Sequence, residues 1–380
     1  MDSKHWEQYR THFPVTEQHV YFQHPAVTAL PSPARVAMHN VIDDMVENGC
    51  LNESSWVQQI ESVRSSASKI VGAPMERLGF VKNTSHGLST LASSFPWEDG
   101  DNAVIPEGEF PANVYPWMNQ TTVKRVPLGD DGGIYLDNIK QTVDNSTRVL
   151  SLSSVQYHNG FRAELKVIGQ FCNEHNIYFV VDGIQSLGWD PIQADNLPIH
   201  ALVADGHKWL CGPEGVGVMY LDKSFQNQLE WTNIGWKSVI NPFTFHEEQF
   251  ELRGSADVIE EGSSNTIGTY GLGASLDILL DAEIQNIRKR NLELTKYACD
   301  ELREAGFRIL RDRWDSHQHS PILVIEHPEV SSEQIHAQAQ KHDIQLSVRA
   351  GRIRLGFHFF NNKTDIDKLM EALGKILYND

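Results

Sequence analysis

Residues 205–217, Asp-Gly-His-Lys-Trp-Leu-Cys-Gly-Pro-Glu-Gly-Val-Gly, stand beside two short apolar runs. The run 201–204 before them and the run 216–221 at their end have the composition of buried strands. Lys208 is therefore expected between two buried strands, where desolvation lowers the pKa of its amine and makes it a nucleophile toward carbonyl groups. This is the chemistry of a lysine that forms a Schiff base. The alternative is a surface lysine in a glycine-rich turn.

An acid ends the preceding apolar run. Residues 177–182, Ile-Tyr-Phe-Val-Val-Asp, predict a strand with Asp182 at its carboxyl end, where open α/β sheets place their ligands. A carboxylate there can pair with a protonated pyridine nitrogen. Enzymes that use pyridoxal phosphate (PLP) need a lysine for the aldehyde and an acid for that nitrogen. Lys208 and Asp182, with one strand-sized run between them, supply both groups.

The chain thus carries two motifs, Asp-Gly-Ile-Gln at 182–185 and Gly-His-Lys at 206–208. Together they resemble the signature of fold-type I PLP enzymes of the class V aminotransferase group. That group includes cysteine desulfurases, isopenicillin N epimerase-like enzymes, kynureninases and C–S lyases. The resemblance covers nearly the whole chain. It implies PLP as the cofactor, held as a Schiff base on Lys208, with Asp182 stabilising the protonated pyridine.

The resemblance also implies an architecture. We expect an α/β protein of the aspartate aminotransferase type, with a mostly parallel sheet of the seven-stranded kind in a large domain and a smaller α+β C-terminal domain. Residues 1–18 are expected to form an exposed arm or short helix, residues 19–260 the large PLP-binding domain, and residues 261–380 the small domain. A long helical region from Tyr270 to Ala305 is expected to link the two domains.

A polar turn opens a predicted helix after the strand end at 79–81. Thr84, Ser85 and His86 stand at this turn, and apolar residues follow at helical spacing until Pro96 ends the helix. Free backbone N–H groups and the helix dipole favour an anion at such a point, so these residues are predicted to hold the cofactor phosphate. The alternative is an ordinary N-cap formed by Thr84 or Ser85.

The resemblance assigns further cofactor contacts. Phe110 matches a position whose aromatic or histidine side chain stacks on the PLP ring, although a core residue is the alternative. Gln156 and Gln185 match polar contacts on the phenolic-oxygen side of the ring, and His207 is expected to contact the phosphate or the cofactor. Ser263 matches a residue that contacts the phosphate of the other subunit, which implies a homodimer. Cysteine desulfurases have a histidine at the position of Phe110.

Asp205 occupies a place where some relatives have a phosphate-binding serine. A carboxylate beside a phosphate is unfavourable, so the Asp205 side chain is expected to point elsewhere.

An arginine interrupts the otherwise apolar strand at 353–356. Arg354 needs a partner there, and a bidentate carboxylate is the best one. In the family the matching arginine binds the α-carboxylate of the substrate. The alternatives are an internal salt bridge or a solvated edge strand. Desulfurases carry a nucleophilic cysteine shortly before this arginine, whereas the segment 346–352 contains none.

Composition excludes other classes of partner. The net charge of −18 argues against nucleic acid and against an anionic membrane surface. No apolar run approaches the roughly 18 residues of a membrane span. The scattered cysteines suggest neither disulfides nor a metal site and favour reduced thiols in a cytoplasm; they are Cys50, Cys172, Cys211 and Cys299.

The sequence motifs identify the cofactor more specifically than the reaction. We place an aminotransferase acting on an amino acid first, and a C–S or β-lyase second. Epimerisation uses the same groups, so these alternatives stay open. A non-catalytic relative that keeps the fold for binding is a further hypothesis, against which the intact Lys208 and Asp182 argue.

Overall fold

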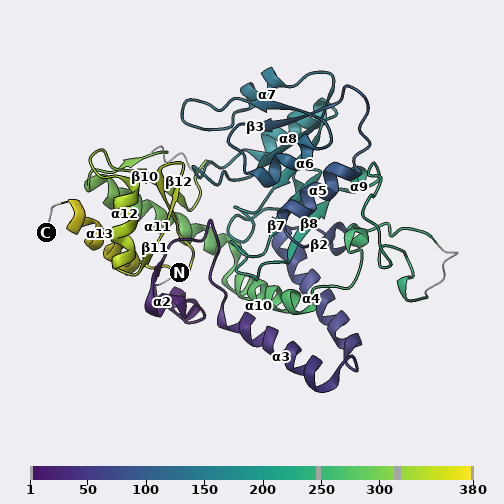
Figure 1. The fold of residues 1–380 in the computed structure, drawn as a ribbon, viewed down its shortest axis with the longest axis horizontal. Helices are drawn as coiled ribbons and strands as arrows, with labels where there is room; N and C mark the ends of the chain where they lie inside the picture. Colours follow the sequence, from purple (N-terminus) through teal and green to yellow (C-terminus); the bar gives the residue numbers. More distant parts are fainter. Residues whose placement is uncertain (1–2, 245–249, 312–317, 378–380) are drawn as a thin grey trace.

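The structure is a computed structural model that describes residues 3–244, 250–311 and 318–377. A larger part built on a seven-stranded sheet joins a smaller part built on a four-stranded sheet (Figure 1). Both chain ends lie on the side of the smaller part, so the chain leaves this part, builds the larger one and returns.

The central sheet has the strand order β2-β8-β7-β6-β5-β3-β4. β8 runs antiparallel to both of its neighbours, and all other neighbouring pairs are parallel. This confirms the expected mostly parallel sheet. Its strands are β2 (Leu78–Val81), β3 (Asn102–Pro106), β4 (Thr122–Val126), β5 (Thr147–Ser153), β6 (Tyr178–Asp182), β7 (Ala201–Asp205) and β8 (Gly217–Leu221).

Alternate side chains of these strands enter two core clusters on opposite faces of the sheet. On β6, Phe179 and Val181 belong to one cluster and Val180 to the other. The period of two along a strand produces this division. Because both faces are covered, the central strands are largely apolar. One cluster includes side chains of α4 (Glu53–Val71), α8 (Leu165–Glu174) and α10 (Thr266–Ala282); the other includes those of α5 (Thr84–Ser94) and α6 (Tyr115–Met118).

The helical region between the two parts is two helices. α10 ends at Ala282, and α11 (Ile284–Glu304) begins after Glu283, whose φ of 60° breaks the helix. α10 packs against α3 (Ser32–Asn48) and α4, so it belongs with the larger part. A domain boundary at residue 260 would therefore separate α10 from the larger part, on which it packs. The domain boundaries stay a prediction.

The smaller part is an antiparallel sheet with the order β12-β13-β10-β9 and a core cluster of its own. Its strands are β9 (Arg308–Ile309), β10 (Ile322–Glu326), β12 (Ser347–Arg349) and β13 (Arg352–Gly356). It also contains α12 (Ser332–Lys341) and α13 (Lys363–Leu377). The remaining helices are α7 (Leu136–Thr142), α9 (Lys223–Gln226) and the 3₁₀ turns Met75–Arg77, Pro111–Asn113, Ala194–Asn196, Pro242–Thr244 and Ala256–Ile259.

The N-terminal segment is docked on the protein rather than exposed. α1 (Ser3–Arg10) and α2 (Val15–Gln18) lead into β1 (Val20–Tyr21), which pairs in parallel with β11 (Ile344–Gln345). Of the two alternatives for residues 1–18, a short helix is observed at Ser3–Arg10, whereas an exposed arm is wrong because Trp6, Tyr9 and Phe13 are buried. Their spacing of three and four residues places these aromatic rings on one side of the chain, which packs on the core.

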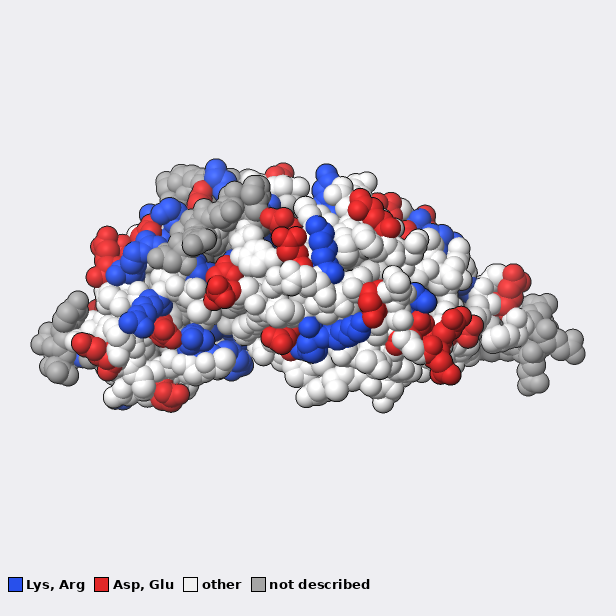
Figure 2. Space-filling view, turned by 90° about the horizontal axis from the view of Figure 1, so that it is seen from above, with Lys and Arg blue, Asp and Glu red and all other residues white. Residues whose placement is uncertain are grey.

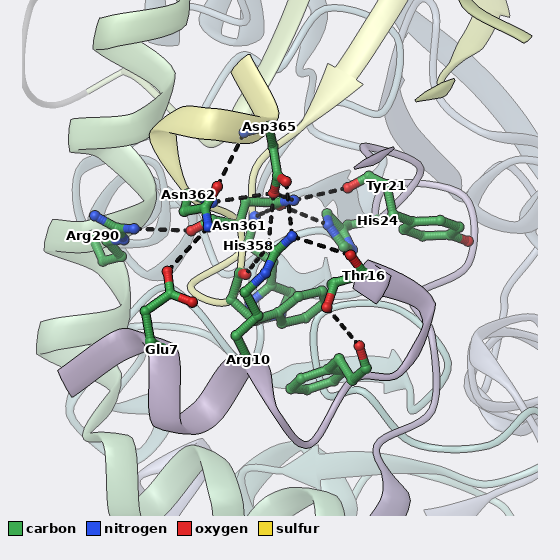
Figure 3. A network of polar contacts seen from close by, with 12 residues as sticks. Glu7, Arg10, Thr16, Tyr21, His24, Arg290, His358, Asn361, Asn362 and Asp365 are labelled. Atoms are coloured by element: carbon green, nitrogen blue, oxygen red, sulfur yellow. Dashed lines mark hydrogen bonds and ion pairs between the residues drawn. The ribbon is translucent and has the colours of Figure 1, made fainter. Parts of the chain in front are cut away.

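A polar network fastens this segment to the C-terminal residues (Figure 3). Both terminal nitrogens of Arg10 donate to the carboxylate of Asp365 at 2.8 Å. Asn361 donates from Nδ2 to Asp365 at 3.0 Å and lies 3.0 Å from His24 Nε2 through Oδ1. His24 is fully buried, so its surroundings fix the loop that follows it.

The surface carries charges of both signs. Acidic and basic side chains are interspersed on the face shown in Figure 2. Among the helices of the described residues, none has the length and apolar character that crossing a membrane requires.

Candidate active site

A cavity of about 280 Å³ lies where the two parts meet, at the carboxyl ends of β5, β6 and β7. The loop after β1, the start of α5, the loop after β3 and the β12–β13 hairpin complete its walls. Eight of the predicted site residues line it: Thr84, Ser85, Phe110, Asp182, Gln185, His207, Lys208 and Arg354. His86, Gln156 and Ser263 do not. A larger hollow of about 430 Å³ beside α8 gathers none of these residues.

Lys208 extends from the turn between β7 and β8 into this cavity. Its Nζ lies 5.8 Å from the centre of the Phe110 ring, and within the described residues it has no ion-pair partner. Burial lowers the pKa of the amine to about 8, with Asp182 opposing this shift and Arg354 reinforcing it. A considerable fraction of the amine is therefore uncharged and nucleophilic slightly above neutral pH.

Asp182 ends β6 at the floor of the cavity and is 1% exposed. Its Oδ1 accepts the backbone N–H of Ile184 at 3.0 Å. The pKa of the carboxyl is raised to about 7. Burial is the main cause, the nearby Glu109 contributes, and Lys208 opposes the shift. No described lysine or arginine lies within ion-pair distance of Asp182, so the carboxyl group fits a cationic ligand atom such as a protonated ring nitrogen.

A second buried carboxyl group lies behind Asp182 and was not predicted. Glu109 accepts hydrogen bonds of 2.6 Å from the Ser153 backbone, the Ser153 hydroxyl and Gln156 Nε2. Burial raises the pKa of Glu109. Gln156 is thereby directed at Glu109 instead of the cavity, because its amide nitrogen is used there. A lone acid before an aromatic residue gives no periodic signal, so the sequence did not single it out.

The start of α5 opens on the cavity, as an anion site requires. The N-cap is Asn83, whose side chain accepts the His86 N–H at 2.8 Å; neither Thr84 nor Ser85 is the cap. Thr84 Oγ1 accepts from the Asp205 N–H at 3.1 Å, and Ser85 is exposed at the cavity wall. The first N–H groups of a helix have no acceptor within it, so this end of α5 can bind a phosphate group.

His86 lies outside the cavity, and so does Ser263, which is predicted to contact the phosphate of the other subunit. The side chains of His86 and Ser263 line a separate hollow of about 330 Å³ together with Lys82. Burial and the charge of Lys82 lower the pKa of His86, which makes it a poor cation for a phosphate. The His86 side chain points to a different side of α5 from the wall formed by Thr84 and Ser85.

His207 and Asp205 form a pair beside Lys208. His207 Nδ1 lies 3.1 Å from Asp205 Oδ2, and Asp205 Oδ1 accepts the Gly206 N–H at 2.7 Å. Asp205 does line the cavity, but its carboxylate is held by these neighbours. An imidazole next to this carboxylate can offset the negative charge toward a bound phosphate.

Gln185 fixes the wall opposite α5. Its Nε2 donates to the Pro25 carbonyl at 2.9 Å, and its Oε1 accepts from Trp209 Nε1 at 2.9 Å. The amide therefore joins the N-terminal loop to the residue that follows Lys208. Pro25 and Ala26 line the cavity, whereas His24 is buried behind them.

Arg354 lies in β13, between β12 and β10, and is 2% exposed. It donates from Nε to Ser347 Oγ at 3.3 Å and from Nη1 to the Tyr157 carbonyl at 2.8 Å. In the described part of the chain it has no carboxylate within ion-pair distance. Burial lowers its pKa to about 10, and Arg349 contributes to this shift. Arg354 is neither on an edge strand nor in a salt bridge with a described residue, so its charge is available to a carboxylate ligand.

Comparison with known proteins agrees with this geometry. The family model described as Aminotransferase class-V matches residues 20–369. A probable cysteine desulfurase of Methanothermobacter thermautotrophicus is 26% identical over 97% of this chain and 98% of its own length. An uncharacterized aminotransferase of Schizosaccharomyces pombe is 26% identical over 91% of this chain and 90% of its own.

Solved structures share the fold. The cysteine desulfurase CsdA from Escherichia coli superposes with a TM-score of 0.87 at 22% identity, over 98% of each chain. The cystine C–S lyase C-DES, in complex with its reaction product cysteine persulfide, gives a TM-score of 0.87 at 20% identity, over 95% of this chain and 98% of its own.

The buried carboxyl group gives a pH prediction for the cofactor-free protein. Because folding raises the pKa of Asp182 from 3.8 to about 7, its contribution to stability is full below the unfolded value and is lost as the pH rises through about 7. Asp182→Asn cannot ionise, so the fall in the free energy of unfolding between about pH 4 and pH 8 should become shallower. Urea unfolding across this range measures it, with Asp137→Asn on exposed α7 as the control. A variant with the wild-type slope would contradict the assignment.

Proposed function

The chain belongs to the class-V aminotransferase family, and from this premise we propose that Lys208, Asp182 and Arg354 carry out chemistry at the Cα of an amino acid. Pyridoxal phosphate is the cofactor of this enzyme. When bound, it supplies an aldehyde that reacts with amines and a ring that withdraws electrons from the substrate Cα. The observation that carries the assignment is one cavity holding an amine of lowered pKa, a buried acid and an unpaired guanidinium.

We assign each part of the cavity to one part of the cofactor. Asp182 pairs with the ring nitrogen, because it is a buried carboxyl group without a cationic partner among the described residues. Thr84, Ser85 and the end of α5 hold the phosphate, and Phe110 lies against the ring. Lys208 would hold the aldehyde of the cofactor. Asp182 and the start of α5 thus suit the ring nitrogen and the phosphate of PLP, and Arg354 remains for the substrate.

The same residues orient the substrate and move its proton. Arg354 binds the α-carboxylate through two parallel hydrogen bonds, which fixes the direction of the Cα–H bond. With the substrate held by Arg354, the Lys208 amine would be the base beside the Cα and would take its proton. A pKa of about 8 suits this role, because the neutral amine is available and still basic.

We place transamination first, as the family reaction in which Lys208 both removes and returns the proton. A C–S or β-lyase is the second candidate, favoured by relatives described as cysteine desulfurases and by the fold shared with a cystine C–S lyase. Both outcomes use the same three residues. They differ in the group that leaves the substrate.

Transfer of sulfur to a thiol of this chain has little support. The β12–β13 hairpin before Arg354 turns in two residues, Ala350 and Gly351, and contains no cysteine. None of the four cysteines lines the cavity. Cys211 is 1% exposed, and burial raises the pKa of its thiol far above the usual range, so it is not a nucleophile.

We further propose a homodimer in the cytoplasm. Exposed apolar side chains gather on the α3–α4 hairpin and before it, which a second copy of the chain would cover: Val27, Leu30, Val36, Ile42, Val46, Leu51 and Val57. Ser263 lies away from the cavity of its own chain, which supports a contact with the partner's cofactor. None of the four cysteines is in a disulfide, which suits a reducing compartment.

Lys208→Ala should abolish turnover and the covalent attachment of the cofactor while leaving the fold intact. Borohydride treatment of the wild type, followed by digestion and mass spectrometry, should add the mass of the reduced cofactor to the peptide that contains Lys208. The variant should release all of its cofactor on denaturation. Lys223→Ala, on the exposed start of α9, is the control and should behave as the wild type. Cofactor fixed to another lysine would refute the assignment.

The dimer is tested at its apolar surface. The wild type should sediment at twice the chain mass at assay concentrations, and Val46→Glu on α3 should weaken this association because it places a charge in the interface. Val167→Glu, equally apolar but on α8, should leave it unchanged. A fully active wild-type monomer would count against the dimer.

The fate of sulfur distinguishes the reaction classes. Incubation with cysteine should give no persulfide on the chain, because no thiol faces the cavity. Any sulfur released should appear as free sulfide, with pyruvate and ammonia. The measurements are alanine, pyruvate and protein-bound persulfide. Stoichiometric persulfide on the chain with alanine as co-product would restore the desulfurase mechanism.

A further inference from the structure

The active-site cavity contains one cation more than the proposed function uses. Arg354 and Lys208 have assigned partners, the substrate α-carboxylate and the cofactor. Arg349 also lines the cavity and has none. Its Nη1 donates a 2.8 Å hydrogen bond to the carbonyl of its neighbour Val348. Across residues 3–244, 250–311 and 318–377, no carboxylate lies within ion-pair distance of Arg349.

The position of Arg349 is fixed by a tight hairpin. Arg349 pairs with Arg352, and the two residues between them, Ala350 and Gly351, have φ values of 48° and 74°. Two consecutive left-handed residues form the turn that matches the twist of the strands, so the register is well defined. Ser347, two residues before Arg349, lies on the same face of β12 and accepts from Arg354. Arg349 and Arg354 therefore serve the same cavity.

The neighbouring arginine of the hairpin shows what a structural cation looks like here. Arg352 donates to Glu326 at 2.9 Å, lies outside the cavity lining and has its charge balanced on the adjacent strand β10. Arg349 lies directly opposite Arg352 in the hairpin, but it has no such partner among the described residues. The two arginines thus differ in the one property that matters for a ligand, a free charge facing the cavity.

The two cavity arginines also occupy different depths. Arg354 is 2% exposed in the interior of the sheet, whereas Arg349 is exposed at the edge of the hairpin. The charge of Arg349 lowers the pKa values of both Arg354 and Lys208, so the three cations repel one another. One α-carboxylate offsets the inner arginine. A second anionic group on the ligand would offset the outer one.

We propose that Arg349 binds a carboxylate on the substrate side chain, so that the enzyme acts on amino acids with an acidic side chain. The inference rests on the proposed function in one respect, that Arg354 holds the α-carboxylate. The substrate then spans the cavity between an inner and an outer guanidinium, with its amine at Lys208. Neutral amino acids of the same length leave the outer cation unpaired and bind more weakly.

Binding of unreactive acids tests the proposal without turnover. Glutarate and pentanoate have equal numbers of carbon atoms and lack an amine, and calorimetry on the PLP-loaded protein measures their affinities at fixed ionic strength. The wild type should bind glutarate about tenfold more tightly, the range expected for one charge-assisted contact at an exposed site. Arg349→Gln should reduce this ratio to about one and leave pentanoate binding within twofold. Arg349→Lys should restore part of the preference.

Arg352→Gln is the matched control and should leave the ratio unchanged. The proposal is overturned if the wild type shows no preference for glutarate, if Arg349→Gln keeps the preference, or if Arg349→Gln weakens both acids equally. The last result would mean that both arginines hold one carboxylate. Arg354→Gln separates this from the proposed function, since it should weaken both acids; if it weakens neither, the role of Arg354 fails whatever the glutarate ratio is.

Discussion

Ionisable groups buried without matching partners are the constraint on which this structure depends. The sheet places Asp182 and the Lys208 turn at neighbouring strand ends, and the small domain brings Arg354 to the same cavity. Each group is costly to bury in its charged form, and the shifted pKa values of Asp182 and Lys208 express that cost. A chain that keeps such a cavity stores binding free energy for a ligand whose charges are complementary. The surrounding layers serve to hold these groups in place.

Much of this arrangement could be predicted from the sequence, because its signals are local. Short apolar runs ending in Asp182 and leading into Lys208 define strands, and parallel strands bring their carboxyl ends together. The residues that escaped prediction act through contacts between distant segments. Glu109 is significant only because the fold places Ser153 and Gln156 around it. Arg349 reaches the cavity only because β12 pairs with β13 in one register.

Other expectations failed for a similar reason. Thr84 and Ser85 are as suitable for capping as Asn83, and only the actual helix start decides between them. Burial of the N-terminal aromatic residues could not be predicted, because Phe13 packs on Phe359 and Phe360, which are far away in the sequence. Short-range pattern therefore identifies the cofactor chemistry, and long-range packing decides substrate recognition.

The pairing of β1 with β11 has a consequence for the way the protein is made. A ribosome completes residues 6–22 long before the segment 344–365 that covers them exists. During most of translation the surface that buries Trp6, Tyr9 and Phe13 is therefore incomplete. The nascent chain exposes these aromatic rings in that interval, which favours aggregation. The wall made by Pro25 and Ala26 follows β1, whose pairing partner β11 is also made late. Loss of the last elements would therefore leave the aromatic residues of the N-terminal segment uncovered, which favours aggregation.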